Sequence, residues 1–106
     1  MKIKTKDKTN NRTKLEISSK YGRIFAWFSY EKLIVFEYEY CDKNDKKYTV
    51  EYTKEKYSKT TTRYLNEIKE KELPRILNHF EPKTEQELQT DLLVYIRKFV
   101  TDEIQG

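Results

Sequence analysis

Cysteine, histidine and glycine are all scarce in this sequence, and each shortage excludes a class of chemistry. A single cysteine, Cys41, excludes an intramolecular disulfide. The absence of disulfides is usual in a reducing compartment such as the bacterial cytoplasm. Together with the single histidine, His79, it cannot supply the three or four ligands of a usual zinc site. Two glycines, Gly22 and Gly106, cannot form a glycine-rich phosphate-binding loop. We therefore expect no metal, no cofactor and no enzymatic activity.

Long apolar runs are also missing. None approaches the length of a membrane span, and the opening residues MKIKTKDK lack the apolar segment of a signal peptide, so we expect a cytoplasmic protein that binds no membrane. Aromatic residues are abundant instead: they make up 14% of the chain, with nine tyrosines, and they bury large areas, which argues against disorder. A chain of 106 residues predicts one domain.

The net charge of +4 is concentrated at one end. Residues 1–14 carry six basic side chains and one acidic one, whereas the rest of the chain is nearly neutral. We interpret residues 1–13 as a basic, flexible N-terminal tail and residues 14–106 as the folded domain. Within the tail, alternation would place four lysines on one face of an extended segment, as candidate phosphate contacts. These lysines are Lys2, Lys4, Lys6 and Lys8. A charged edge strand or a solvated terminus would explain the pattern equally well.

Hydrophobic periodicity predicts an α+β fold. Alternation with period two favours an antiparallel sheet of three to four strands, at about residues 14–18, 24–30, 33–40 and 47–53. Helical spacing follows, and we predict helices at about residues 60–73, 75–80 and 84–103, packed on one face of the sheet. The last helix has the strongest pattern. Thr84 and Glu87 form a capping box, and an apolar stripe follows, made of Leu88, Leu92, Tyr95, Ile96, Phe99, Val100 and Ile104.

Tyrosine and arginine are often hot-spot residues of protein interfaces, and they supply the candidate partner-binding residues here. These are Tyr38, Tyr40, Tyr48, Tyr52 and Arg63. The alternative is that these tyrosines lie beneath the helices and form part of the core. Thr60 and Thr61, at the start of a predicted helix, are further candidate phosphate contacts, since free N–H groups and the helix dipole favour anions there. The simpler interpretation is that Ser58 or a threonine only caps this helix.

Two segments of the chain are distinctive. The first contains Ser29, Tyr30 and Glu31, and the second contains Tyr57, Ser58, Thr60, Thr61, Thr62, Arg63 and Leu65. They resemble the pattern of a family of small uncharacterised proteins of tailed phages and mobile elements, which is S-Y-x-T before an apolar strand, then Y/W-S-x-T-T-S/T-K/R-H-I/L before a helix. Lys32 replaces the usual threonine, and Tyr64 replaces the usual histidine. The resemblance implies a mobile-element accessory protein that works inside a Gram-positive bacterial host.

Small non-catalytic proteins of such elements often act by occupying a surface of a host macromolecule. We therefore expect a binding protein that inhibits a host or rival protein or nucleoprotein, in its sharpest form an anti-CRISPR-type inhibitor of a Cas effector. The alternative is a small nucleic-acid-binding accessory protein that uses the basic N-terminal tail and tyrosine stacking. A third possibility is a structural protein that forms a homodimer through its edge strand or its C-terminal helix.

Overall fold

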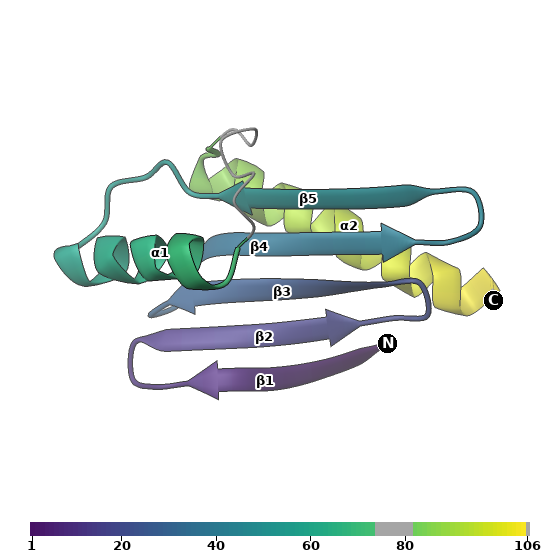
Figure 1. The fold of residues 1–106 in the computed structure, drawn as a ribbon, viewed down its shortest axis with the longest axis horizontal. Coiled ribbons are helices and arrows are strands. Elements are labelled where there is room, and N and C mark those ends of the chain that lie inside the picture. The colour runs from purple at the N-terminus through teal and green to yellow at the C-terminus, as the bar shows by residue number, and fades with distance from the viewer. Residues whose placement is uncertain (74–81, 106) are drawn as a thin grey trace.

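The computed structural model describes residues 1–73 and 82–105 and shows the predicted α+β architecture (Figure 1). Five antiparallel strands form one sheet in which every strand lies beside its neighbour in sequence. They are β1 (Lys2–Lys8), β2 (Arg12–Ser18), β3 (Gly22–Ser29), β4 (Lys32–Cys41) and β5 (Lys46–Tyr52). Two helices follow, α1 (Lys59–Lys71) and α2 (Glu85–Gln105). The helix predicted over 75–80 lies outside the described residues.

Strand β1 is the main departure from the predicted sheet. It occupies most of the segment that we expected to be a flexible tail, and it adds a fifth strand by pairing with β2 along the sheet edge. Every residue of β1 is exposed, and Ile3 is its one interior apolar residue, so hydrophobic alternation gave little signal there. A register shift between Thr5 and Asp7 also interrupts the expected lysine row. As a result Lys4 and Lys8 lie on opposite faces of the sheet.

The helices cover opposite faces of the sheet, which corrects the prediction that both pack on one face (Figure 1). On one face α1 packs Tyr64 and Ile68 against a cluster that includes Trp27. On the other face α2 packs Leu88 and Phe99 against a second cluster. The second cluster draws from the strands Ile17, Ile24, Ala26, Leu33, Phe36, Tyr38 and Tyr40. The physical reason is that β3 and β4 carry apolar residues at consecutive positions, which point to alternate faces and therefore need a cover on both.

Gly22 permits the close approach of α2 to the sheet at the start of β3. A Cβ atom at this position would lie 2.4 Å from the carbonyl oxygen of Glu39 and 3.0 Å from the ring of Phe99. No side chain can be accommodated at 2.4 Å from a backbone oxygen without movement. Glycine is therefore required here for packing, and not for an unusual backbone angle.

Specific polar contacts fix the ends of the two helices. The predicted capping box of α2 is confirmed: Thr84 donates its backbone N–H to Glu87 at 3.1 Å, and the N–H of Glu87 donates to the Thr84 hydroxyl at 3.2 Å. At the C-terminal end of α1, the carboxylate of Glu72 accepts from the indole Nε1 of Trp27 at 2.8 Å and from Lys14 Nζ at 2.7 Å. Trp27 is buried, so this contact ties α1 directly to the sheet. Neither helix combines the length and the apolar composition that a membrane crossing needs, as far as the described residues show.

Candidate functional site

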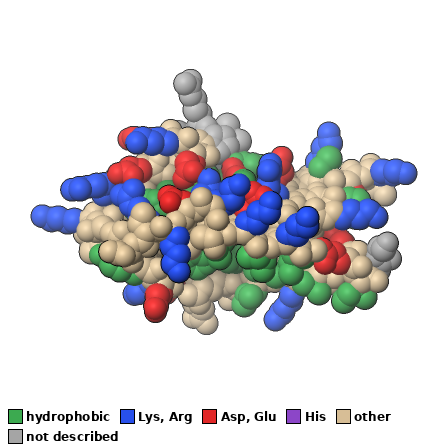
Figure 2. All heavy atoms as spheres, turned by 90° about the horizontal axis from the view of Figure 1, so that it is seen from below, with side chains coloured by type: hydrophobic (Ala, Val, Ile, Leu, Met, Phe, Trp, Pro, Cys, Tyr) green, Lys and Arg blue, Asp and Glu red, His purple; other side chains and the backbone are tan. Residues whose placement is uncertain are grey.

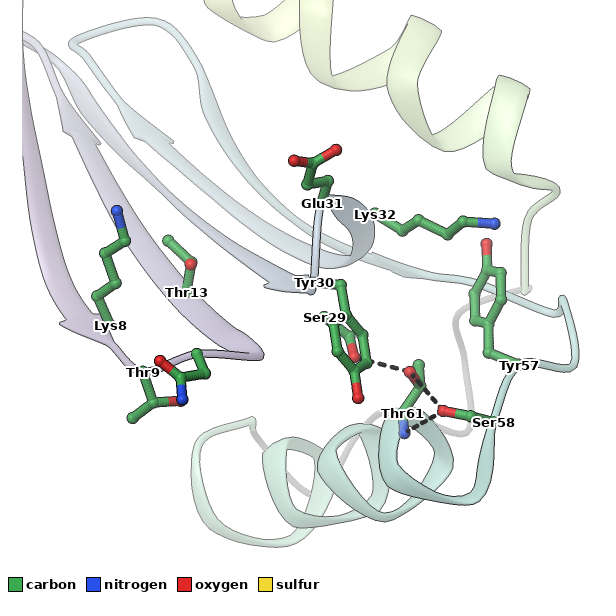
Figure 3. A pocket seen from close by; sticks show the side chains of 11 residues that line it. Lys8, Thr9, Thr13, Ser29, Tyr30, Glu31, Lys32, Tyr57, Ser58 and Thr61 are labelled. Atoms are coloured by element: carbon green, nitrogen blue, oxygen red, sulfur yellow. Dashed lines mark hydrogen bonds between the residues drawn. The ribbon is translucent and has the colours of Figure 1, made fainter.

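A cleft of about 820 Å³ opens at one end of the sheet, where the β3–β4 turn faces the start of α1 (Figure 3). Three separate parts of the chain form its wall: the β1–β2 connection, the β3–β4 turn and the segment that enters α1. The lining residues are Lys8, Thr9, Asn10, Thr13, Ser29, Tyr30, Glu31, Lys32, Tyr57, Ser58 and Thr61. A volume in this range is typical of ligand-binding clefts.

Tyr30 is placed at the rim of this cleft by its backbone. It has a φ of 57°, in the left-handed region that non-glycine residues seldom adopt, and its N–H donates to the carbonyl oxygen of Asn11 at 2.8 Å. Its side chain remains 56% exposed. Figure 3 shows the ring projecting from the β3–β4 turn toward the first turn of α1. The tight two-residue turn thus presents a large aromatic ring in a defined position next to polar groups.

A chain of hydroxyl groups joins the two sides of the cleft (Figure 3). Ser29 and Thr61 share a buried hydrogen bond of 2.7 Å between their side-chain oxygens. Ser58 donates to the same Thr61 oxygen at 3.3 Å, and it caps α1 by accepting the Thr61 N–H at 3.3 Å. The two segments that carry the family resemblance therefore meet here, although 28 residues separate Ser29 from Tyr57. The hydroxyl of Thr61 is engaged in this network, and Thr60 is exposed outside the lining.

Positive charge accompanies the aromatic rings of the cleft. Lys8 and Lys32 both line it, and Lys32 Nζ lies 4.9 Å from the centre of the Tyr57 ring. No acidic side chain lies in the first turn of α1. A second hollow of about 530 Å³ shares Tyr57 with the cleft and continues along α1 past Lys59 and the candidate residue Arg63. The hollow is also lined by two acidic residues, Glu67 and Glu70. The cleft and this hollow adjoin at Tyr57, and we name them together the α1 track.

The two positions that depart from the family pattern have different surroundings. Lys32 belongs to the cleft, as described above. Tyr64 is buried against the sheet, and the guanidinium of Arg12 lies 4.4 Å from the centre of its ring. Burial raises the pKa of Tyr64 to about 12. Arg12 in turn forms an ion pair of 2.7 Å with Glu67. Tyr64 therefore serves packing in this chain.

The predicted patch of four tyrosines is not present as one surface. Tyr38 and Tyr40 are buried beneath α2, where the Tyr38 ring stacks on Tyr95 with 4.0 Å between ring centres. Burial raises the pKa of Tyr38 to about 12. Tyr48 and Tyr52 lie on the opposite face with the α1 cluster. The alternative weighed from the sequence, that tyrosines lie beneath a helix, therefore holds for Tyr38 and Tyr40.

The four lysines proposed as phosphate contacts are likewise separated. Lys8 lines the cleft, whereas Lys6 contacts Glu16 at 3.8 Å further along the edge. Lys2 and Lys4 lie toward the other end of β1. The bulge in β1 and the length of the strand separate the row, so only its last member joins the α1 track.

A second exposed surface lies on α2. Leu88, Leu92 and Phe99 are buried as the periodicity predicts, but the stripe extends beyond the part that the sheet covers. Two of its members, Val100 and Ile104, are exposed, and Leu93 and Val94 of the same helix are exposed as well. We name Leu93, Val100 and Ile104, together with the exposed Ile3 of β1, the α2 stripe. Ile104 is 80% exposed and Ile3 61%.

The two elements of the α2 stripe lie on the same face of the molecule. Ile3 pairs with Ile17, whose side chain belongs to the cluster beneath α2, and the N-terminal ammonium of Met1 pairs with Glu103. Figure 2, seen from the side of β1, shows hydrophobic side chains gathered on the α2 side of the molecule and charged ones on the α1 side. Sequence periodicity placed Val100 and Ile104 on the apolar stripe of this helix. In the structure both side chains are exposed to solvent.

One buried carboxyl group was not anticipated from the sequence. Glu51 of β5 is 6% exposed under α2, and its Oε1 has no hydrogen-bond partner among the described residues. Burial, and then a hydrogen bond to Asp91, raise its pKa to about 8; Glu87 adds to the rise and Lys83 opposes it. A metal site would need at least three His, Cys, Asp or Glu side chains close together. No such group is found in residues 1–73 and 82–105.

Two further reactive side chains were singled out in the sequence. Cys41 is exposed at the end of β4, and His79 lies outside the described residues. In comparisons with known proteins, no family model, no curated protein and no solved structure matches this chain.

Proposed function

We propose that this protein is a non-catalytic inhibitor that binds a host macromolecule and occupies a surface which that macromolecule needs. The observation that carries the proposal is the α2 stripe. Three aliphatic side chains at positions i, i+7 and i+11 of one helix, with Ile3 alongside, remain in contact with water although the same helix buries its neighbouring side in the core. Exposed apolar side chains gathered on one face of a molecule are a feature of protein interaction sites.

The partner class follows from the chemistry of the stripe. Aliphatic side chains gain free energy by leaving water and have no means of recognising a phosphate or a sugar, so the stripe favours a protein surface. The resemblance of residues 29–31 and 57–65 to proteins of tailed phages supports a partner inside a bacterial host cell, in the cytoplasm. Within that class, the sharpest form of the proposal is an anti-CRISPR-type inhibitor of a Cas effector.

The test has two parts. The first measures binding of this protein to the purified, immobilised Cas ribonucleoprotein, and the second measures nucleic-acid cleavage by that ribonucleoprotein with and without this protein. The double variant Ile3→Thr, Ile104→Gln removes two exposed aliphatic groups without adding charge. We expect it to weaken binding by about tenfold or more, since interface side chains of this size contribute on the order of 1–2 kcal/mol each. Thr101→Gln, at an exposed position next to Val100 but around the helix from it, is the matched control and should bind as the parent protein does.

Two results would contradict the proposal. One is the absence of any complex with host effector proteins at micromolar concentration. The other is a complex that the double variant forms as tightly as the parent. Light scattering of the free protein separates a third outcome, in which a second copy of the chain covers the stripe and the double variant shifts a homodimer to the monomer.

A further inference from the structure

The α1 track shares no residue with the α2 stripe, so it requires its own explanation. It combines three features that a purely structural cleft does not need. A large ring, that of Tyr30, is exposed at the rim. Lys8 and Lys32 line the cleft, whose lining includes a single acidic residue, Glu31. The adjoining hollow adds Lys59 and Arg63 and also Glu67 and Glu70, so the basic character of the track is concentrated in the cleft.

We propose that the α1 track binds a short segment of single-stranded nucleic acid, with a base stacked on Tyr30 and the adjoining phosphates on Lys8 and Lys32. This site lies beyond the proposed inhibitory contact on α2 and does not depend on it. Together, the two sites would allow one small protein to contact both the protein and the nucleic-acid component of a nucleoprotein.

The aromatic ring determines the kind of ligand. Tyr30, which the turn places at the rim of the cleft, offers an exposed ring to any base, and stacking of this type tolerates all sequences. Bases in a duplex are already stacked on one another and cannot reach a ring inside a cleft, so the track should select single strands.

The cations determine where the backbone of the strand runs. Lys8 comes from the β1–β2 side of the cleft and Lys32 from the β4 side. A single-stranded nucleic acid that crosses the cleft would therefore have one lysine on each side. Beyond Tyr57 the path continues to Lys59 and Arg63. Phosphate contacts of this number give weak, salt-dependent binding, with dissociation constants on the order of micromolar at low salt.

The experiment measures the fluorescence anisotropy of a labelled ten-nucleotide oligothymidylate as the full protein is added, at several salt concentrations. Tyr30→Asn removes the ring and keeps the turn, because asparagine tolerates left-handed backbone; we expect it to weaken binding by about tenfold. Lys8→Gln and Lys32→Gln should each weaken binding and reduce the slope of log affinity against log salt by about one. Lys4→Gln, on the opposite end of β1, is the control and should change affinity little.

A blunt-ended duplex and a glutamate-rich peptide serve as competing probes. We expect the duplex to bind more weakly than the single strand and the peptide not to displace it. The proposal is overturned if the oligonucleotide does not bind at low salt, if Tyr30→Asn binds as the parent does while its urea midpoint is unchanged, or if the peptide occupies the track with equal affinity. Loss of effector binding in the Ile3→Thr, Ile104→Gln variant leaves this test unaffected, so the two proposals fail separately.

Discussion

The buried carboxyl group of Glu51 should make the stability of the protein depend on pH in an unusual direction. In the unfolded chain this group titrates near its ordinary pKa of 4.5, whereas in the folded protein its pKa is about 8. Between these values the unfolded state loses the proton and the folded state keeps it. The stabilising contribution is therefore fully present below pH 4.5 and is lost progressively as the pH rises toward 8.

The size of the effect follows from the same two values. The free energy of unfolding falls by about 1.4 kcal/mol for each pH unit in this window, which amounts to about 3 kcal/mol at pH 7. Glutamine has the same shape and does not ionise, and its amide can donate to Asp91. The variant Glu51→Gln should therefore equal the parent protein near pH 4.5 and exceed its stability by about 2–3 kcal/mol at pH 7.

Urea unfolding at pH 5, 7 and 8.5, followed by circular dichroism, measures this difference directly. Glu39→Gln provides the matched control, because Glu39 is an exposed carboxylate on the adjacent strand whose pair with Arg23 lies at the surface. It should change stability by less than about 1 kcal/mol at every pH. A gain for Glu51→Gln that is the same at pH 5 and pH 7, or no gain at all, would refute the assignment of a neutral buried carboxyl group.

Two further predictions concern packing and capping. Gly22→Ala should destabilise the protein by about 1–3 kcal/mol, since its methyl group would meet the carbonyl oxygen of Glu39 on β4 and the ring of Phe99 on α2. An unchanged urea midpoint would show that these groups do not crowd Gly22. Thr84→Ala should cost about 1 kcal/mol in the same assay, because it removes the hydroxyl that accepts the Glu87 N–H. Thr101→Ala, within the exposed part of α2, is its control and should have little effect, so equal losses in both variants would argue against the capping box.

The parts of the fold that were predictable are those whose signal is local. The capping box fixed the start of α2 to within one residue, and the strands that carry alternating apolar residues were found near their observed bounds. Strand β1 was not predicted, because every residue of this edge strand is exposed and its lysines resemble those of a solvated tail. The placement of the two helices on opposite faces was not predicted either. It depends on which side of the sheet each helix reaches, and the hydrophobic periodicity of a helix does not contain that information.

The candidate site shows the same division. Both segments of the cleft, around Tyr30 and around Thr61, were distinctive in the sequence, but their contact is tertiary. The separation of the tyrosines has a similar cause. The β4–β5 turn sets a register in which Tyr38 lies opposite Thr49 and Tyr40 opposite Lys47. The tyrosines of β5 therefore point to the other face, and a register shifted by one residue would have gathered all of them on one side.

The contact between Trp27 and Glu72 gives the protein an intrinsic optical probe. Trp27 is the only tryptophan in the chain, so the tryptophan emission of the whole molecule originates from one indole, whose N–H donates to Glu72 at the C-terminal end of α1. Any event that lifts or tilts α1 admits solvent to that indole and moves its emission to longer wavelength. Occupancy of the cleft, which is built partly on the first turn of the same helix, can thus be followed without a label on the protein, while events at α2 should leave the spectrum unchanged.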